Sequence, residues 1–137
     1  MKTKITIAIL MALTLFSIAV ATGNIDQTAF NYYCGNMTGS SEWRYKSNES
    51  KVFLHPITGT TIQYRVEGRF ANSSTVFAAS GYHSLSTGNY YSLTNMVHEW
   101  YLDYARLGFK SVNVPVITSG YWSPDSELNY TIVPLGL

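Results

Sequence analysis

The chain has 137 residues, of which 46% are hydrophobic, 15% are aromatic and only 12% are charged, with a formal net charge of +1. This length allows one ordinary domain, and the composition is too apolar for intrinsic disorder. A single cysteine excludes an intrachain disulfide scaffold and a zinc site built from several thiolates. The near-zero charge argues against a protein that binds nucleic acid by neutralising phosphates.

The N-terminus has the features of a secretory signal peptide. Lys2 and Lys4 precede an uncharged apolar run, residues 5–20, which leads into the small-residue pattern Ala-Val-Ala. Positive residues, an apolar segment and a small-residue cleavage site together predict a signal peptide over residues 1–21. The run of 16 residues is shorter than the roughly 20 that span a bilayer, so an uncleaved membrane anchor is the less favoured alternative.

Cleavage after residue 21 would leave a secreted chain of 116 residues with seven basic and eight acidic side chains. A chain of that size can bury about two-thirds of its unfolded surface, which is enough for one core. No later stretch is apolar enough to cross a membrane. We therefore expect a single all-β domain over residues 22–137, without a stable transmembrane segment.

The mature chain begins with three short runs rich in aromatic or β-branched residues, at 28–34, 42–46 and 52–55. Polar, turn-forming stretches separate them, at 35–41, 47–50 and 56–59. Runs of this length, bounded by glycine, proline, asparagine and serine, are typical of short β-strands.

Residues 60–70 form the clearest predicted strand. One side of it carries the apolar residues Ile62, Tyr64, Val66, Gly68 and Phe70, and the other carries Gln63, Arg65, Glu67 and Arg69. Successive side chains of a strand point to opposite faces, so this pattern predicts a half-buried antiparallel strand. We expect its charged side to be a solvated face with alternating charge.

The strand pattern continues after this segment. Runs at 75–79 and 82–85 flank Ser80-Gly81, where the glycine allows a bulge or a sharp bend. Residues 86–89 predict a hairpin turn that leads into a strand over 90–94.

The C-terminal part predicts three further strands. Residues 104–111 alternate again between apolar and polar side chains. The following run, 112–122, contains Pro115, which predicts an edge strand or a break. A turn at 123–126 then precedes the last strand at 129–134.

Segment 97–107 is ambiguous, because Val97, Trp100, Tyr101 and Tyr104 also fit a helical spacing. Its aromatic content and the flanking strands favour a strand over a short helix. The whole pattern is about eight short strands, spaced roughly every 8–12 residues. It predicts an antiparallel β-sandwich, with a jelly-roll-like or partly open barrel as the alternative.

No coherent catalytic or metal-binding pattern is present. His98-Glu99 begins like the HExxH zinc motif, but Leu102 stands where the second histidine ligand belongs. The other histidines, His55 and His83, show no short ligand spacing to it. We expect a protein that is not an enzyme and holds no metal or cofactor. A small metal-dependent hydrolase using His83, His98 and Glu99 is a less favoured hypothesis.

The sequence also contains no recognisable motif for nucleophilic catalysis. The chain lacks the Gly-x-Ser-x-Gly motif of serine hydrolases and any glycine-rich phosphate loop. Cys34 follows two tyrosines in a predicted strand, where a buried structural thiol is the commoner fate. As an odd cysteine in an exported chain, Cys34 could instead pair between chains.

The aromatic content is the most informative feature for function. Nineteen of the 116 residues after the signal peptide are Phe, Trp or Tyr, and eleven of these are Tyr. Exposed Tyr and Trp can stack on sugars or anchor a protein partner, because they combine a large apolar area with a polar tip. Adjacent aromatics cannot both face inward on a regular strand. The candidate binding residues are Tyr90, Tyr91, Trp100, Tyr101 and Tyr121.

Two C-terminal segments, 104–111 (YARLGFKS) and 119–126 (SGYWSPDS), resemble small exported β-rich proteins of Gram-positive bacteria, a family of unknown function. The similarity extends more loosely to the signal peptide and to segments 29–31 and 86–89. The resemblance implies a secreted bacterial protein without established catalytic residues. It argues against glycosylation of the four Asn-x-Ser/Thr sites, at Asn36, Asn48, Asn72 and Asn129.

Together these observations favour a secreted, non-enzymatic binding or surface-interaction protein. It would contact an extracellular glycan or protein through exposed aromatics, and no nucleic acid is expected as a partner. A secreted antagonistic protein, bacteriocin-like or membrane-active, is the second hypothesis. Insertion into a bilayer would need long alternating hairpins, and only residues 60–70 have such a pattern.

Overall fold

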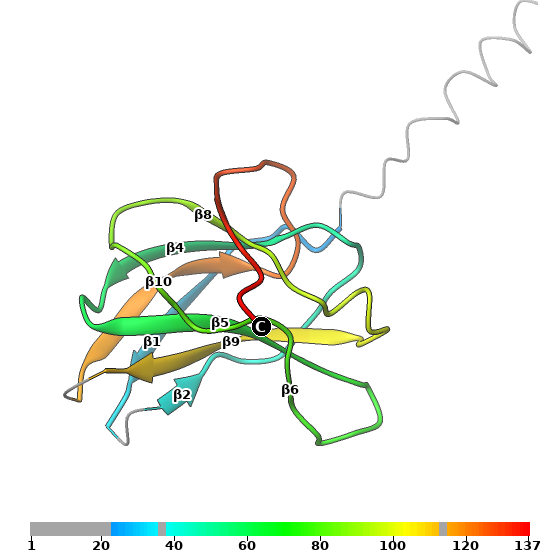
Figure 1. The fold of residues 1–137 in the computed structure, drawn as a ribbon, viewed down its shortest axis with the longest axis horizontal. Coiled ribbons are helices and arrows are strands. Elements are labelled where there is room, and N and C mark those ends of the chain that lie inside the picture. Colours follow the sequence, from blue (N-terminus) through cyan, green and yellow to red (C-terminus); the bar gives the residue numbers. More distant parts are fainter. Residues whose placement is uncertain (1–22, 36–37, 113–114) are drawn as a thin grey trace, which may run out of the picture.

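The computed structural model describes residues 23–35, 38–112 and 115–137, so the predicted signal peptide lies outside the described residues. Within these ranges the protein is all-β and has no helix, which confirms the predicted fold class. Two sheets form a sandwich and do not close into a barrel, and β4 and β10 run above β5 and β9 in the view of Figure 1.

The described residues form eleven strands rather than about eight, because several are too short to leave a pattern in the sequence. The strands are β1 (Thr28–Tyr33), β2 (Thr38–Ser40), β3 (Arg44–Tyr45), β4 (Val52–Thr58), β5 (Ile62–Arg69), β6 (Phe77–Ala78), β7 (His83–Ser84), β8 (Tyr91–Leu93), β9 (Tyr104–Ser111), β10 (Ile117–Ser123) and β11 (Thr131–Val133). The strand β2 lies inside the stretch that was predicted to be a turn.

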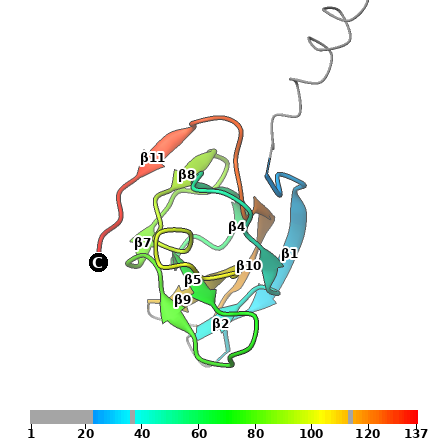
Figure 2. The same ribbon diagram turned by 90° about the vertical axis from the view of Figure 1, so that its right-hand side faces the viewer.

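The first sheet has five strands in the order β1-β10-β4-β8-β11. The neighbours are antiparallel except at one edge, where β11 runs parallel to β8 (Figure 2). The second sheet has six strands: its path is β2-β9-β5-β6, with β3 also paired to β9 and β7 also paired to β5. The central strands β5 and β9 pair along their full length, from Ile62–Ser111 to Arg69–Tyr104.

The core lies between the sheets and is filled by alternate side chains of their long strands. Tyr64 and Phe109 come from the second sheet, and Leu54 and Trp122 come from the first; all four are almost completely buried. The Tyr64 hydroxyl lies 2.8 Å from the Thr118 hydroxyl across the core. Burial raises the pKa of Tyr64 to about 12, so its hydroxyl stays protonated.

The predicted alternation of residues 60–70 is confirmed on its apolar side, where Ile62 and Val66 are buried. Phe70 is different: it follows the end of β5, is 40% exposed and packs against Phe77. The prediction for the charged side is wrong. Glu67 is only 5% exposed, because two arginines and neighbouring aromatic rings cover the outer face of this sheet.

The turn predicted at 56–59 is also wrong, because β4 continues through Pro56 to Thr58. Proline fits here since β8 pairs with β4 only as far as Leu54, so that no β8 residue pairs with Pro56. Its carbonyl accepts a hydrogen bond from the Gly88 N–H at 2.8 Å. On the other edge, the register of β10 shifts between Ser119 and Gly120, beside Pro56.

Two connections differ from their predictions. Residues 86–89 do not close a hairpin, because β7 pairs within the second sheet and β8 within the first. The strand favoured over 97–107 begins only at Tyr104. Residues 97–101 form a hydrogen-bonded turn, with Trp100 N–H donating to the Met96 carbonyl and Leu102 N–H to that of Val97. Both segments are crossovers between the sheets, which local patterns do not reveal.

Candidate functional site

The outer surface of the five-stranded sheet carries aromatic side chains. Along β4, Val52 and Leu54 point into the core, so Phe53 and His55 point outward. On the neighbouring strand β10, Tyr121 is the register partner of His55 and is 43% exposed. Of these outward-pointing rings, Tyr121 is open to solvent, whereas Phe53 is only 2% exposed because the rings of Tyr90 and Tyr130 pack against it.

Two further rings reach this surface from the opposite edge of the sheet. Parallel pairing of β11 with β8 places Tyr130 beside Tyr90. The Tyr90 carbonyl accepts a hydrogen bond from the N–H of Thr131, the first residue of β11. The centroids of the Tyr90 and Tyr130 rings are 5.6 Å apart, and Tyr130 lies 5.3 Å from Phe53. We call the set Phe53, His55, Tyr90, Tyr121 and Tyr130 the aromatic face.

Tyr90 lies at the centre of the aromatic face. Its ring stacks on His55 with a centroid separation of 4.2 Å and an interplanar angle of 7°. The His55 ring is held in turn by a 2.9 Å hydrogen bond between Nδ1 and the Asn89 carbonyl. Tyr90 is nevertheless 51% exposed. It is thus a flat aromatic surface fixed in orientation and open to solvent.

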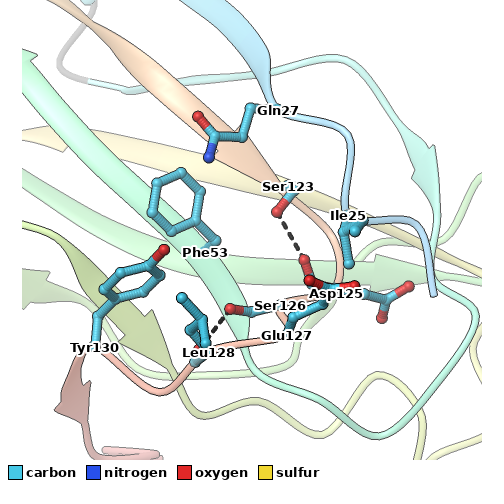
Figure 3. A pocket seen from close by; sticks show the side chains of 9 residues that line it. All are labelled: Ile25, Gln27, Phe53, Ser123, Asp125, Ser126, Glu127, Leu128 and Tyr130. Atoms are coloured by element: carbon cyan, nitrogen blue, oxygen red, sulfur yellow. Dashed lines mark hydrogen bonds between the residues drawn. The ribbon is translucent and has the colours of Figure 1, made fainter. Parts of the chain in front are cut away.

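A small pocket of about 130 Å³ adjoins the aromatic face, and Phe53 and Tyr130 form part of its wall. In Figure 3 the rings of these two residues lie next to each other, and the side chain of Gln27 points toward Phe53. Glu127 also lines the pocket and is exposed. The site thus combines apolar rings with an amide and a carboxylate that can form hydrogen bonds to a ligand.

Asp125 forms another part of the pocket wall, but its carboxylate is engaged within the protein. It accepts hydrogen bonds from the Lys46 ammonium at 2.8 Å, the Asn24 N–H at 2.7 Å and the Ser47 N–H at 3.0 Å. Burial raises the pKa of Asp125, but these hydrogen bonds outweigh burial and hold the pKa below its usual value. The group is therefore ionised and structural.

The five predicted binding residues do not form one site. Tyr90 and Tyr121 both lie on the aromatic face, whereas Tyr91 is 7% exposed and points into the core. The Tyr91 hydroxyl also bonds to the backbone of Ser86. The pair Trp100-Tyr101 lies in the turn between the sheets, and neither ring contacts the aromatic face within the described residues.

Phe53, His55 and Tyr130 were not predicted from the sequence as site residues. The alternation of Val52-Phe53-Leu54-His55 carries a signal for the first two, since it places them on the face opposite the aliphatic pair. No local signal identifies Tyr130, because its place depends on how β11 pairs with a strand from the middle of the chain.

The side chains considered for catalysis are not brought together. His83 lies on β7 against Gly136, whereas His98 is an exposed residue of the 97–101 turn. The described part of the chain contains no group of three or more His, Cys, Asp or Glu side chains placed to hold a metal ion. Cys34 is fully buried as a free thiol, and burial raises its pKa, which disfavours the reactive thiolate.

Comparison with known proteins gives a family but no activity. Residues 16–126 match the model of a family described as "Protein of unknown function (DUF2712)". No curated protein and no solved structure matches the chain. Nothing helical in the described residues is long and apolar enough to cross a membrane.

Proposed function

The chain belongs to the DUF2712 family of proteins of unknown function, and we propose that it is an exported, non-enzymatic protein that binds a glycan on the aromatic face. The observation that carries this proposal is the ring of Tyr90, held flat on His55 and half-exposed to solvent. A ring fixed in this way can bind a flat apolar surface without losing much side-chain entropy.

Sugars suit this surface because a pyranose ring has an apolar face and a rim of hydroxyl groups. The apolar face would stack on Tyr90, with Tyr121 and Tyr130 extending the contact on either side. The hydroxyls would meet Gln27 and Glu127 at the adjoining pocket. The pocket volume of about 130 Å³ suits part of one sugar unit, so the remainder of a glycan would lie along the open face.

Substitution of the exposed rings tests this function. We expect Tyr90→Ala and Tyr121→Ala each to weaken binding to the best ligand of a broad glycan panel. A tenfold loss for Tyr90→Ala would correspond to about 1.4 kcal/mol. Binding is measured by calorimetry and by the change in tryptophan fluorescence, and the fold of each variant is checked by circular dichroism.

Tyr101→Asn is the matched control, because Tyr101 is 86% exposed but lies outside the aromatic face. Its φ of 58° also suits asparagine, so the fold should be unaffected. Absence of binding across the whole panel contradicts the proposal, and so does an equal loss in Tyr101→Asn. Capture of a protein by the same tyrosines, without glycan binding, would assign the face to a protein partner.

Export is a separate part of the proposal. It rests on the charge and hydropathy pattern of residues 1–21. Expression with the native N-terminus should release a protein whose intact mass is that of residues 22–137. A product that retains residues 1–21 and sediments with membranes would replace export with anchoring.

A further inference from the structure

The outer face of the six-stranded sheet differs in chemistry from the aromatic face. Arg65 and Arg69 point outward from β5, and Arg106 and Lys110 point outward from β9. The register pairs Glu67 with Arg106 and Gln63 with Lys110. We call the four basic residues Arg65, Arg69, Arg106 and Lys110 the cationic stripe. They extend from the Gln63–Lys110 pair to Arg69, six residue steps along β5 or about 20 Å at the usual rise.

Glu67 is the carboxylate at the centre of this stripe. Its Oε1 accepts hydrogen bonds from Arg65 at 2.6 and 2.9 Å, and its Oε2 accepts one from Arg106 at 2.7 Å. Within the described residues, neither Arg69 nor Lys110 forms an ion pair. The stripe therefore carries an excess of three positive charges.

Within the described residues, the other acidic groups close to the stripe form no ion pair with it. Asp103, which precedes β9, directs its carboxylate to the backbone N–H of Ala71 at 2.7 Å. Glu42 lines a different hollow, with Arg44 and Trp122 on the side toward β1. An anion from outside would thus be attracted without displacing an existing ion pair.

Aromatic rings fix the guanidinium groups in place. The Arg65 guanidinium lies 4.6 Å from the centre of the Tyr82 ring, and Trp43 holds Arg106 at 4.3 Å and Arg69 at 5.0 Å. The buried Nε of Arg69 has no hydrogen-bond partner in the described structure. Since the rings and Glu67 restrain these side chains, little conformational entropy would be lost on binding.

The stripe borders a groove of about 280 Å³. Arg65, Glu67 and Arg106 line it together with Tyr82 and the strand β2 (Thr38–Ser40), whereas Arg69 and Lys110 are not among its lining residues. The hydroxyls and backbone of β2 add neutral hydrogen-bonding groups beside the charges. The groove has the composition expected of a site for a negatively charged chain.

We propose that the cationic stripe binds a linear, phosphodiester-linked polyol chain, with phosphates on Lys110, Arg106 and Arg69, in that order along the stripe. The basic residues follow one another along the stripe as Lys110, Arg65, Arg106 and Arg69, alternating between β9 and β5. Each is offset from the next by two residues, about 7 Å along the strands, so the stripe offers closely spaced cations along a line. Short, flexible polyol units can place phosphates at this spacing.

Single-stranded nucleic acid fits this surface less well. Its bases would need free aromatic rings on which to stack, as in other single-strand-binding proteins. Trp43, Tyr82 and Tyr104 are the rings on this face, and each already lies against a guanidinium group. The phosphate contacts would therefore be made without the base contacts.

The test measures binding of the full chain to a synthetic poly(glycerol phosphate) at several salt concentrations. Arg69→Gln and Lys110→Gln remove cations that have no ion pair, so the fold should be retained. We expect each variant to bind several-fold more weakly and to reduce the slope of log K against log salt by roughly 0.7–1. Lys51→Gln, with the same change in charge at a different surface, is the matched control.

Three results would overturn the assignment. These are undetectable binding at low salt, an equal loss in Lys51→Gln, and equal affinity for polygalacturonate or a single-stranded oligonucleotide. Tyr90→Ala should leave poly(glycerol phosphate) binding unchanged, because Tyr90 lies on the other sheet. Failure of the glycan proposal and failure of this one are therefore distinguishable.

Discussion

Lys46 shows how much a single residue can contribute to this fold. Its side chain and that of Asp125 are both completely buried, and the two charges lie 2.8 Å apart. The remaining Nζ hydrogens are accepted by the carbonyls of Ser50 at 2.5 Å and Pro124 at 2.8 Å. Burial lowers the pKa of Lys46, and the hydrogen bond to Asp125 opposes that effect. The ammonium is thus retained only because every donor has a partner.

We predict that Lys46→Met strongly destabilises the protein. The change removes the cation but leaves the Asp125 carboxylate buried, which typically costs about 3–5 kcal/mol. Urea unfolding at neutral pH measures the loss. Lys51→Met, at a partly exposed lysine, should change the free energy of unfolding by about 0.5 kcal/mol or less. Similar losses in both variants would mean that the buried pair has no special role.

At the scale of the elements, the approach of β4 to β10 is the tightest constraint. A Cβ atom on Gly120 would lie 2.2 Å from the His55 carbonyl oxygen and 2.9 Å from the Pro56 Cα. Both contacts are with backbone, which cannot rotate away. Glycine at this position therefore allows the two strands to pair where the register shifts, directly behind the aromatic face.

We predict that Gly120→Ala disrupts this pairing and lowers stability by about 3 kcal/mol, the upper end of the usual cost of overpacking. Thermal and urea unfolding measure the change. Gly39→Ala on β2 is the control, because its Cβ would meet its nearest neighbour, the Cys34 sulfur, at an ordinary 3.7 Å. If Gly120→Ala is as stable as Gly39→Ala, the strands can separate more easily than the structure indicates.

The whole molecule is held at one end by the Asp125 carboxylate. It connects the segment before β1, through the Asn24 N–H, to the connection between β3 and β4, through Ser47 and Lys46. Asp125 itself follows β10. Three segments that are distant in sequence therefore depend on one ionised group.

This arrangement predicts a loss of stability in acid. The pKa of Asp125 is lower in the folded protein than its ordinary value of 3.8, so the folded state favours the ionised form. The resulting stabilisation is complete above that ordinary value and is lost as the pH falls below about 4 toward the folded pKa. Urea unfolding between pH 6 and pH 2.5 measures it. A profile for Asp125→Asn with the same acid slope as the wild type would contradict this origin.

Much of the fold could be predicted from periodicity. The bounds of β9 were predicted to the residue, and the apolar side of β5 was assigned correctly through Val66. Alternation places Glu67 on the correct face, but it does not predict that the side chain is buried there. That cover comes from Arg106 and Trp43, on other segments of the chain.

The candidate site was also predicted only in part. The two tyrosines at 90 and 121 were predicted to be binding residues and do lie on one face, but Tyr91 is buried and the 97–101 turn lies between the sheets. Alternation shows only that adjacent aromatics take opposite sides. It cannot show which side faces the core when a strand is three residues long.

The sequence by itself determined the all-β class and which side chains share a face, because side-chain direction in a strand repeats every two residues and needs no knowledge of distant contacts. The tertiary structure alone decided which faces meet and which remain open. Parallel β11 brings Tyr130 to Tyr90, and Lys46 reaches Asp125 across 79 residues of chain. Such contacts depend on strand pairing and desolvation in the complete sandwich, so the sequence of a local segment does not predict them.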